Sequence, residues 1–166
     1  MNLQKLFEIQ AGLDYHIVKE KGLEGQDLLD EKILALQVEL GELANELPEV
    51  FKFWSNKKND YEKALKEYVD CLHFFLSIGL DLGYNYKSKF LKKWQNGRED
   101  ITEHFNFVFW CVAELKNRQE VTEWDYFYMF GGFLALGELL EFTWEQIETA
   151  YLEKNKINHE RQINGY

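Results

Sequence analysis

Proline, cysteine and long apolar segments are all scarce in this chain. Its 166 residues include one proline and two cysteines. Because proline interrupts helices, its near absence permits long helices and argues against a loop-rich β-sandwich. Cys71 and Cys111 each lie in an apolar helical pattern, which favours buried, reduced thiols over a disulfide. Neither an apolar leader after Met1 nor a membrane-length apolar run is visible, so we expect a cytoplasmic protein without a membrane partner.

Basic residues are also scarce relative to acidic residues. The chain has 19 lysines and arginines against 29 aspartates and glutamates, a net charge of −10. Such a chain repels polyanions, which argues against nucleic acid or an anionic membrane as a partner. A small anionic substrate would require local bases or a bridging metal ion. With 46% hydrophobic and 16% aromatic residues, the chain can bury a substantial core, and its length predicts one domain over residues 1–166.

The apolar residues recur with a helical period throughout the chain, with no strand pattern, linker or internal repeat. Helices are predicted at about 2–20, 27–47, 60–82, 86–95, 100–117, 122–141 and 143–163. Pro48 should end the second helix, and Thr143 should open the last one in a capping box with Gln146. The apolar set of the second helix includes Ile33, Leu34, Leu36, Leu40, Leu43 and Leu47. The predicted fold class is therefore all-α, a compact helical bundle.

Two acidic pairs with the same spacing occur in consecutive predicted helices. Glu39 and Glu42 form the first pair, and Glu67 and Asp70 form the second. Residues three apart are neighbours on one helix face, and apolar residues flank each pair, so the carboxylates should border the core. Four converging carboxylates repel one another unless a cation lies between them. Because hard oxygen ligands favour Mg²⁺ or Mn²⁺, the spacing predicts a metal site.

These acidic positions also have simpler interpretations. Glu-x-x-Glu on a surface helix is most often a solvated charge pair. His73 follows Asp70 at the same spacing, which suggests the Glu-x-x-His ligands of di-iron bundles, but the preceding helix has no matching histidine. We therefore interpret His73 as a buried side chain that is hydrogen-bonded to a neighbour.

Further candidate residues lie in the last helix and in an aromatic loop. Lys154, Asn158 and Arg161 share one helix face, either as a solvated helix end or as a phosphate clamp opposite the acidic pairs. Trp54 either packs in the core or stacks on a planar ring. Lys57 in the same loop is either solvated or in contact with an anion.

Longer strings around these residues resemble known families. The acidic pairs are similar to those of the all-α NTP pyrophosphohydrolases, the MazG-like superfamily. The strings at 42–46, 51–55, 67–74, 151–159, 161–162 and 165–166 look like the dimeric dUTPase family, and 6–14 resembles its opening helix. The resemblance runs in order along nearly the whole chain. Pro48 and Glu49 depart from the family's usual loop, so the contacts of that loop, including Lys52, stay open.

The resemblance implies a bundle of the all-α NTP pyrophosphatase type that hydrolyses dUTP to dUMP and pyrophosphate, with dUDP as a further candidate substrate. It implies Mg²⁺, or alternatively Mn²⁺, held by Glu39, Glu42, Glu67 and Asp70. Glu39 is the candidate catalytic base that orients the attacking water. The residues implied to bind substrate are Gln10, Asp14 and Trp54 for the uracil, and Lys57, Lys154, Asn158 and Arg161 for phosphates or sugar.

Two other functions stay open from the sequence. One is a house-cleaning pyrophosphohydrolase that acts on dCTP or a modified nucleotide. The other is a non-catalytic helical scaffold that binds proteins and whose acidic residues form a solvated face. A panel of nucleotides separates the first from a dUTPase, and stabilisation by Mg²⁺ separates the second.

A homodimer is expected from the resemblance and from the aromatic content. Two runs, 105–110 and 124–130, are apolar nearly all round, and helices of that kind must be buried on most sides. One small bundle should not bury both runs fully, so a second copy is the natural cover. The alternative is that these two helices form the core of the monomer itself.

Overall fold

The computed structural model describes residues 2–84, 100–117 and 120–165, which fold into helices. The helices are α1 (Leu3–Lys21), α2 (Leu29–Asn45), α3 (Pro48–Phe51), α4 (Tyr61–Asp81), α5 (Ile101–Asn117), α6 (Glu123–Leu139) and α7 (Trp144–Ile163). No strand occurs among the described residues, so the all-α prediction is confirmed. The helix expected at 86–95 lies outside the described residues.

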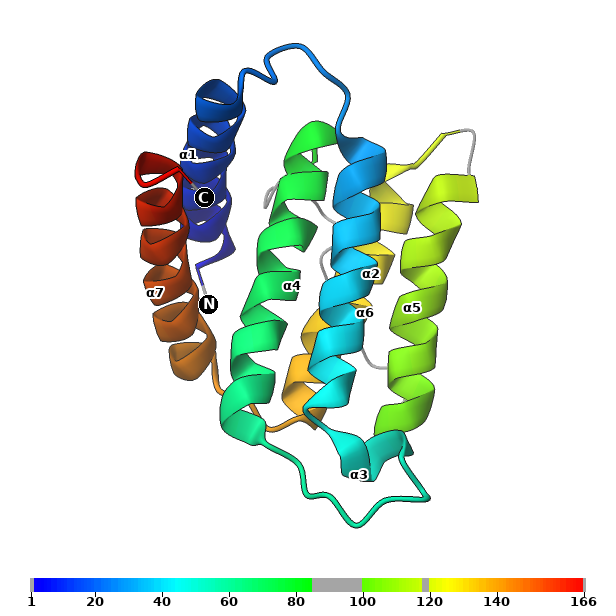
Figure 1. Ribbon diagram of the computed structural model, residues 1–166. Coiled ribbons are helices and arrows are strands. Elements are labelled where there is room, and N and C mark those ends of the chain that lie inside the picture. The colour runs from blue at the N-terminus through cyan, green and yellow to red at the C-terminus, as the bar shows by residue number, and fades with distance from the viewer. Residues whose placement is uncertain (1, 85–99, 118–119, 166) are drawn as a thin grey trace.

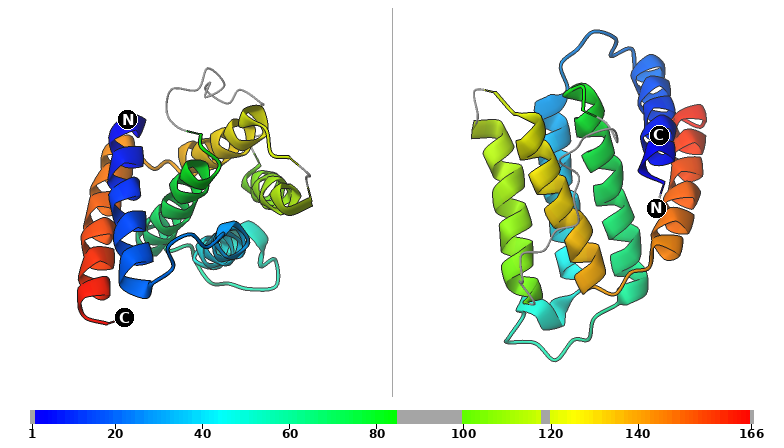
Figure 2. Two further views of the ribbon diagram at one scale, coloured as in Figure 1. Left: turned by 90° about the horizontal axis from the view of Figure 1, so that it is seen from above. Right: turned by 180° about the vertical axis from the view of Figure 1, so that it is seen from behind.

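Helix α4 lies at the centre of the molecule. It contacts α2 and α6 as well as α1 and α7. Because α2 also contacts α5, and α5 contacts α6, the helices α2, α4, α5 and α6 form a bundle (Figure 1). Helices α1 and α7 lie side by side and pack against α4 as a second layer (Figure 2). Side chains of α1, α2 and α7 can therefore meet those of α4, which carries the second acidic pair.

Buried aromatic side chains fill the core around α4. Tyr68 and Tyr126 are fully buried, and their hydroxyls donate to the backbone carbonyls of Phe133 and Phe75, at 3.4 and 2.8 Å. A Cβ on Gly79 would clash with the Tyr126 hydroxyl. The absence of a side chain at Gly79 thus lets α6 insert this tyrosine against α4, and the buried hydroxyl keeps a hydrogen bond.

Local capping chemistry sets several helix boundaries. The predicted capping box of Thr143 and Gln146 is present at the start of α7. A second box, formed by Thr122 and Asp125, opens α6. Pro48 follows the end of α2, as predicted, and it also occupies the first turn of the short helix α3. A proline is tolerated there since the N–H that it lacks would have no partner within the helix.

The two aromatic runs pack against each other inside the monomer. Helices α5 and α6 are in contact, and the buried residues of the runs are Phe105, Phe107, Val108, Tyr126, Phe127, Met129 and Phe130. The large hydrophobic residues of these runs that stay exposed are Trp110 and Trp124, at 54% and 50%. Helices α5 and α6 therefore cover most of both runs within the monomer. The two runs are not buried fully, as the sequence predicts, because Trp110 and Trp124 stay half exposed.

The cysteines behave as the sequence predicts. Cys71 and Cys111 are both buried and both free of disulfides. Burial raises the pKa of the Cys71 thiol well above its ordinary value, so this thiol stays protonated and unreactive at neutral pH. None of the described helices combines the length and the hydrophobicity needed to cross a membrane.

Candidate active site

Three of the four predicted carboxylates meet between α2 and α4. Glu39 comes from α2, and Glu67 and Asp70 come from α4, and one oxygen from each lies within 4.8 Å of the others. All three side chains are partly buried, because each helix turns this face toward its neighbour. An oxygen-only donor set of this kind suits Mg²⁺ or Mn²⁺. We call these three residues the carboxylate cluster.

The carboxylate cluster resists full ionisation. Burial, followed by the charges of Asp70, Glu42 and Glu67, raises the pKa of Glu39 to about 7. Burial also raises the pKa of Glu67, with Asp70 as the next cause. Burial raises the pKa of Asp70, although Lys154 opposes that shift. Because three negative charges here repel one another, the cluster gains stability from a cation.

Glu42 stands apart from the other three. Its side chain is exposed and is not among the atoms that converge in the carboxylate cluster. Its charge nevertheless contributes to the raised pKa of both Glu39 and Glu67. The structure thus places Glu42 at the edge of the site, and its role as a metal ligand stays a prediction.

Helix α7 brings basic and amide side chains to the carboxylate cluster. Lys154 Nζ lies 2.5 Å from Asp70 Oδ2, and the two side chains are only 26% and 13% exposed. Arg161 Nη1 donates to Asn158 Oδ1 at 3.4 Å, and its charge lowers the pKa of Asp70. The predicted polar face of the last helix therefore does point at the acidic residues rather than into bulk solvent.

A cavity of about 570 Å³ lies beside the carboxylate cluster, within the range typical of small-molecule sites. The predicted site residues that line it are Gln10, Asp14, Glu39, Asp70, Lys154, Asn158 and Arg161. Another part of the cavity wall is apolar and is formed by Ile17, Val18, Leu23 and Leu28. One cavity thus joins acidic, basic, amide and apolar surfaces from α1, α2, α4 and α7, as a nucleotide with a charged and a planar end requires.

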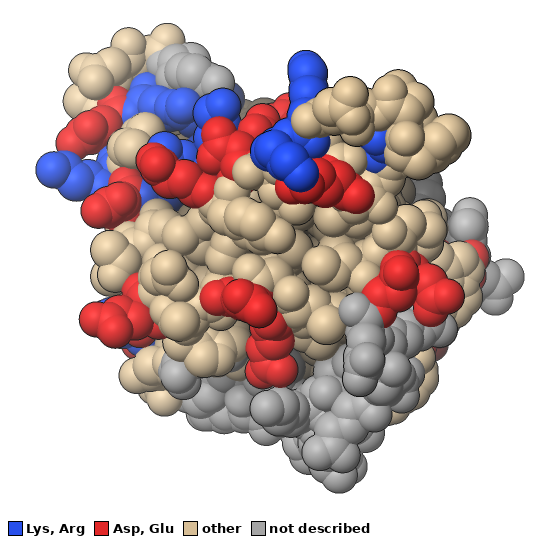
Figure 3. All heavy atoms as spheres, turned by 90° about the horizontal axis from the view of Figure 1, so that it is seen from below, with Lys and Arg blue, Asp and Glu red and all other residues tan. Residues whose placement is uncertain are grey.

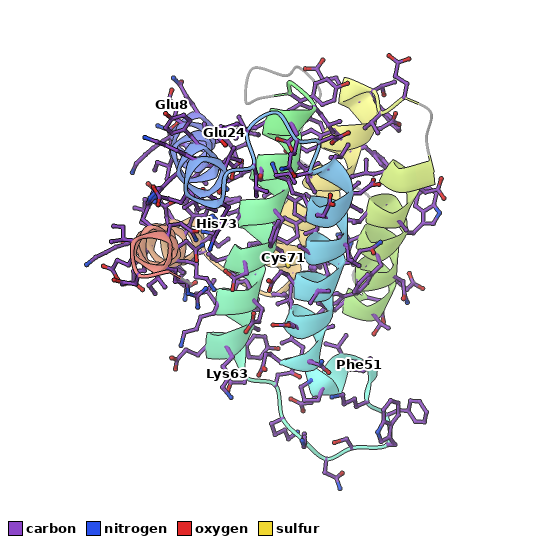
Figure 4. The ribbon with its side chains drawn as sticks, turned by 45° about the horizontal axis from the view of Figure 1, so that its top comes forward. Glu8, Glu24, Phe51, Lys63, Cys71 and His73 are labelled. Carbon is purple, nitrogen blue, oxygen red and sulfur yellow. The ribbon has the colours of Figure 1, made fainter. Side chains whose placement is uncertain are left out.

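A hydrogen-bond network occupies the part of the cavity formed by α1 and α4. Gln10 Nε2 donates to Asp14 Oδ1, and Ser77 Oγ donates to Asp14 Oδ2, each at 2.7 Å. His73 Nδ1 lies 2.7 Å from Gln10 Oε1, which also accepts the Tyr151 hydroxyl at 2.8 Å. Figure 4 shows His73 on the side of α4 that faces α1 and α7. The interpretation of His73 as a buried, hydrogen-bonded side chain is confirmed.

Trp54 and Lys57 lie outside this cavity. They belong to the 52–60 loop between α3 and α4, which extends from the end of the molecule where Phe51 and Lys63 lie (Figure 4). Trp54 is 67% exposed and its ring meets Phe51 edge-on. Neither Trp54 nor Lys57 lines the cavity, so their substrate contacts stay predictions. Seen from this end, basic side chains are interspersed with acidic ones (Figure 3).

The site also contains Lys32, Ser77 and Tyr151, which are not among the residues predicted from the sequence. Ser77 follows Asp70 by two helical turns, and Lys32 precedes Glu39 by two turns. A search at that spacing along each acidic face would have found both. Tyr151 gave no separate signal, because a tyrosine in an apolar stripe is usually a core residue.

Comparison with protein families gives an independent result. The family model described as dUTPase matches residues 2–166. The chain belongs to the dUTPase family. No curated protein matches it. The match covers every helix that contributes to the cavity, from α1 to α7.

This dUTPase is accordingly a nucleoside triphosphate pyrophosphohydrolase, and dUTP is the substrate that its family implies. The resemblance of the sequence to the dimeric dUTPases is confirmed. The wider relationship to the MazG-like superfamily stays a prediction. Fold alone does not fix a function, but here the family match and the contents of the cavity agree.

Proposed function

We propose that this dUTPase hydrolyses dUTP to dUMP and pyrophosphate with Mg²⁺ as its cofactor and Mn²⁺ as a substitute, and that dUDP is a second candidate substrate. The observation that carries the proposal is the carboxylate cluster, two of whose members, Glu39 and Asp70, line a nucleotide-sized cavity. Family membership supports dUTP as the substrate. The buried free thiols suit a cytoplasmic location, where thiols stay reduced.

The residues present fit a hard divalent cation. Glu39, Glu67 and Asp70 offer oxygen ligands only. Their pKa values are raised, first by burial and then, for Glu39 and Glu67, by the neighbouring carboxylates. Glu42, one turn after Glu39, would complete the ligand set by rotating its exposed side chain. Mg²⁺ in this position would neutralise phosphate charge and lower the pKa of a nearby water.

The side chains of the protein then carry the reaction. Glu39, which belongs to the carboxylate cluster and lines the cavity, is the residue that we assign to accept the proton of the attacking water. The water oxygen bonds to the β-phosphorus, the bond from this phosphorus to the α-phosphate oxygen breaks, and dUMP leaves. Lys154, which pairs with Asp70 in the free enzyme, turns to a phosphate oxygen. Asn158 and Arg161 bind further phosphate or sugar oxygens.

Gln10 and Asp14 form the proposed uracil end of the cavity. Their side chains are held by hydrogen bonds before any ligand arrives, which reduces the entropy lost on binding. Trp54 is proposed to cover the base, and Lys57 to contact a phosphate. Because both lie outside the cavity, these contacts require the 52–60 loop of this subunit, or of a second copy, to reach it.

A homodimer is also proposed. The exposed Trp110 and Trp124 lie over buried or partly buried rings of α5 and α6, namely Phe107 and Tyr128, at ring-centroid distances of 6.3 and 4.7 Å. Exposed aromatic groups of this kind are enriched at protein interfaces. Together with the family resemblance, they support association through this face.

Product release from a nucleotide panel tests the proposal. We would measure pyrophosphate from dUTP, dCTP, dTTP and modified deoxynucleotides, and phosphate from dUDP, each with and without Mg²⁺. The proposal expects dUTP to be hydrolysed fastest and only with a divalent cation. Comparable kcat/KM for dUTP and dCTP would favour a house-cleaning pyrophosphohydrolase. No hydrolysis of any nucleotide with either Mg²⁺ or Mn²⁺ would favour a binding scaffold.

A further inference from the structure

A buried histidine nitrogen in the cavity wall lacks a partner among the described residues. This atom is Nε2 of His73, whose side chain is 6% exposed and lines the cavity. Tyr151 covers one face of the imidazole, with ring centroids 4.1 Å apart, and Gln10 occupies the Nδ1 edge. A buried polar atom without a partner is costly, so its presence in a cavity wall points to a hydrogen bond with a ligand.

Asp14 fixes the direction of the hydrogen bonds that lead to this nitrogen. A carboxylate only accepts, and Asp14 receives Gln10 Nε2 and Ser77 Oγ at 2.7 Å each. Burial raises the pKa of Asp14, while these two hydrogen bonds and the charge of Lys32, whose Nζ lies 4.0 Å away, oppose that shift and favour the carboxylate. Since Gln10 turns its NH₂ group toward Asp14, its oxygen must point the other way, toward His73.

The hydrogen bond from His73 to Gln10 determines the tautomer of His73. Gln10 Oε1 only accepts, so Nδ1 of His73, 2.7 Å away, must carry the proton. Burial and the charge of Lys154 lower the pKa of His73 to about 3. The backbone of Tyr151 offsets this shift only in part and is not a hydrogen-bond partner of Nε2. The imidazole is therefore neutral at physiological pH and has one ring proton. Nε2 consequently presents a lone pair, which accepts hydrogen bonds and cannot donate them.

We propose that Asp14 is a positioning residue that acts through Gln10 to hold His73 in its Nδ1–H tautomer, so that Nε2 accepts a hydrogen bond from the imide N3–H of uracil. Asp14 itself then does not contact the base. The inference rests on the proposed binding of dUTP in this cavity. Cytosine has a lone pair at N3, which would face the lone pair of Nε2. A ligand hydroxyl could form a hydrogen bond with either tautomer of His73, because it can rotate to donate or accept. Nε2 therefore selects between bases and not between hydroxyl-bearing ligands.

The isosteric substitution Asp14→Asn tests the relay directly. An asparagine can keep its carbonyl toward Ser77 and turn its NH₂ group toward Gln10, whose amide would then rotate and donate to Nδ1 of His73. The proton would move to Nε2 and the polarity of the cavity wall would invert. Ser77→Ala is the matched control, since it removes a hydrogen bond to Asp14 but leaves the charge of Asp14 in place.

Nitrogen NMR of the ligand-free protein measures the tautomer of His73 and does not depend on enzymatic activity. Long-range ¹H–¹⁵N correlations distinguish a protonated from a bare ring nitrogen. The wild type and Ser77→Ala should show His73 protonated at Nδ1, and Asp14→Asn should show it wholly or partly protonated at Nε2. A wild-type His73 protonated at Nε2 would overturn the proposal. The proposal would equally fail if Asp14→Asn left the tautomer unchanged, or if Ser77→Ala shifted it as Asp14→Asn does.

Kinetics then test whether the tautomer selects the base. The ratio of kcat/KM for dUTP to that for dCTP should fall by about tenfold or more in Asp14→Asn, and by much less in Ser77→Ala, because an unpaired buried polar group discriminates strongly. An unchanged ratio in an Asp14→Asn protein whose tautomer has inverted would overturn the base-reading role. If the wild type hydrolyses no nucleotide, the proposed function fails, while the NMR result still decides whether Asp14 controls His73.

Discussion

Lys154 Nζ of α7 lies 2.5 Å from Asp70 Oδ2 of α4. This ion pair places a positive charge at the edge of three carboxylates that otherwise repel one another. It also ties the outer α1–α7 layer to the bundle at the site where a metal ion and a triphosphate are proposed to bind. Lys154 therefore compensates the charge of the metal-free site, and it is the residue that we propose to bind a phosphate oxygen.

The substitution Lys154→Met should affect catalysis and stability together. Loss of a positioned charge should lower kcat/KM for dUTP by about 100-fold. The metal-free variant should melt at a lower temperature than the wild type, because the carboxylate cluster loses its compensating charge, and Mg²⁺ should recover part of that loss. Lys156→Met is the matched control, since Lys156 is 77% exposed and makes only a 3.8 Å pair with Glu160. Wild-type kcat/KM in Lys154→Met would exclude Lys154 from the phosphate site.

The substitution Glu67→Gln should separate metal binding from folding. Removing one of three clustered charges relieves repulsion, so the metal-free variant should melt no lower than the wild type. The rise in melting temperature on adding Mg²⁺ should shrink, and hydrolysis should fall by about 100-fold or more. Glu62→Gln on the same helix is the control, because Glu62 is 85% exposed and pairs with Lys66. Retention of the full Mg²⁺ response in Glu67→Gln would remove Glu67 from the ligand set.

Glu39 should make the metal-free protein less stable as the pH rises. Burial and the charges of Asp70, Glu42 and Glu67 raise the pKa of Glu39 to about 7 from 4.5. Below pH 4.5 both the folded and the unfolded chain hold the proton. Between 4.5 and 7 the folded chain holds more of it, so the free energy of unfolding falls as the pH rises, and the loss is complete above 7.

Chemical denaturation in EDTA at about pH 5 and pH 8 measures this effect against Glu39→Gln, which cannot titrate. The wild type should lose more stability than the variant over this interval. With Mg²⁺ in place of EDTA at pH 8, the wild type should instead be the more stable of the two proteins, because the ionised carboxylate is the form that binds metal. Identical pH dependence in the two proteins would show that Glu39 is not perturbed as proposed.

The exposed tryptophans should mark the dimer interface. Light scattering of the purified protein at micromolar concentration should give twice the mass of one chain. Trp110→Glu should shift the protein toward monomer, because it places a charge on the aromatic face of α5. Leu34→Glu is the control, since Leu34 is 62% exposed but lies on α2. A monomer mass for the wild type would refute the dimer. A Trp110→Glu variant that stays dimeric would show that the interface does not include Trp110.

Short-range features of this protein were readable from its sequence. The capping box of Thr143 and Gln146 depends on residues three apart in one helix. The shared faces of the acidic pairs follow from the helical period in the same way. Periodicity was less reliable within an apolar cluster. The apolar pattern of α2 predicts that Leu34 faces the core, yet Leu34 is 62% exposed, because it falls between the positions at 33 and 36 that face the core.

The sequence by itself determined the all-α fold, the acidic spacing, the basic face of the last helix and the burial of His73, because each depends on residues within a few turns of one another. Only the tertiary structure decided which of these faces meet. Asp70 and Lys154 are 84 positions apart, and their contact depends on how α4 and α7 pack. The same holds for the network from Asp14 through Gln10 to His73, which crosses from α1 to α4. Helix packing sets such distances, and a linear pattern of residue types does not contain them.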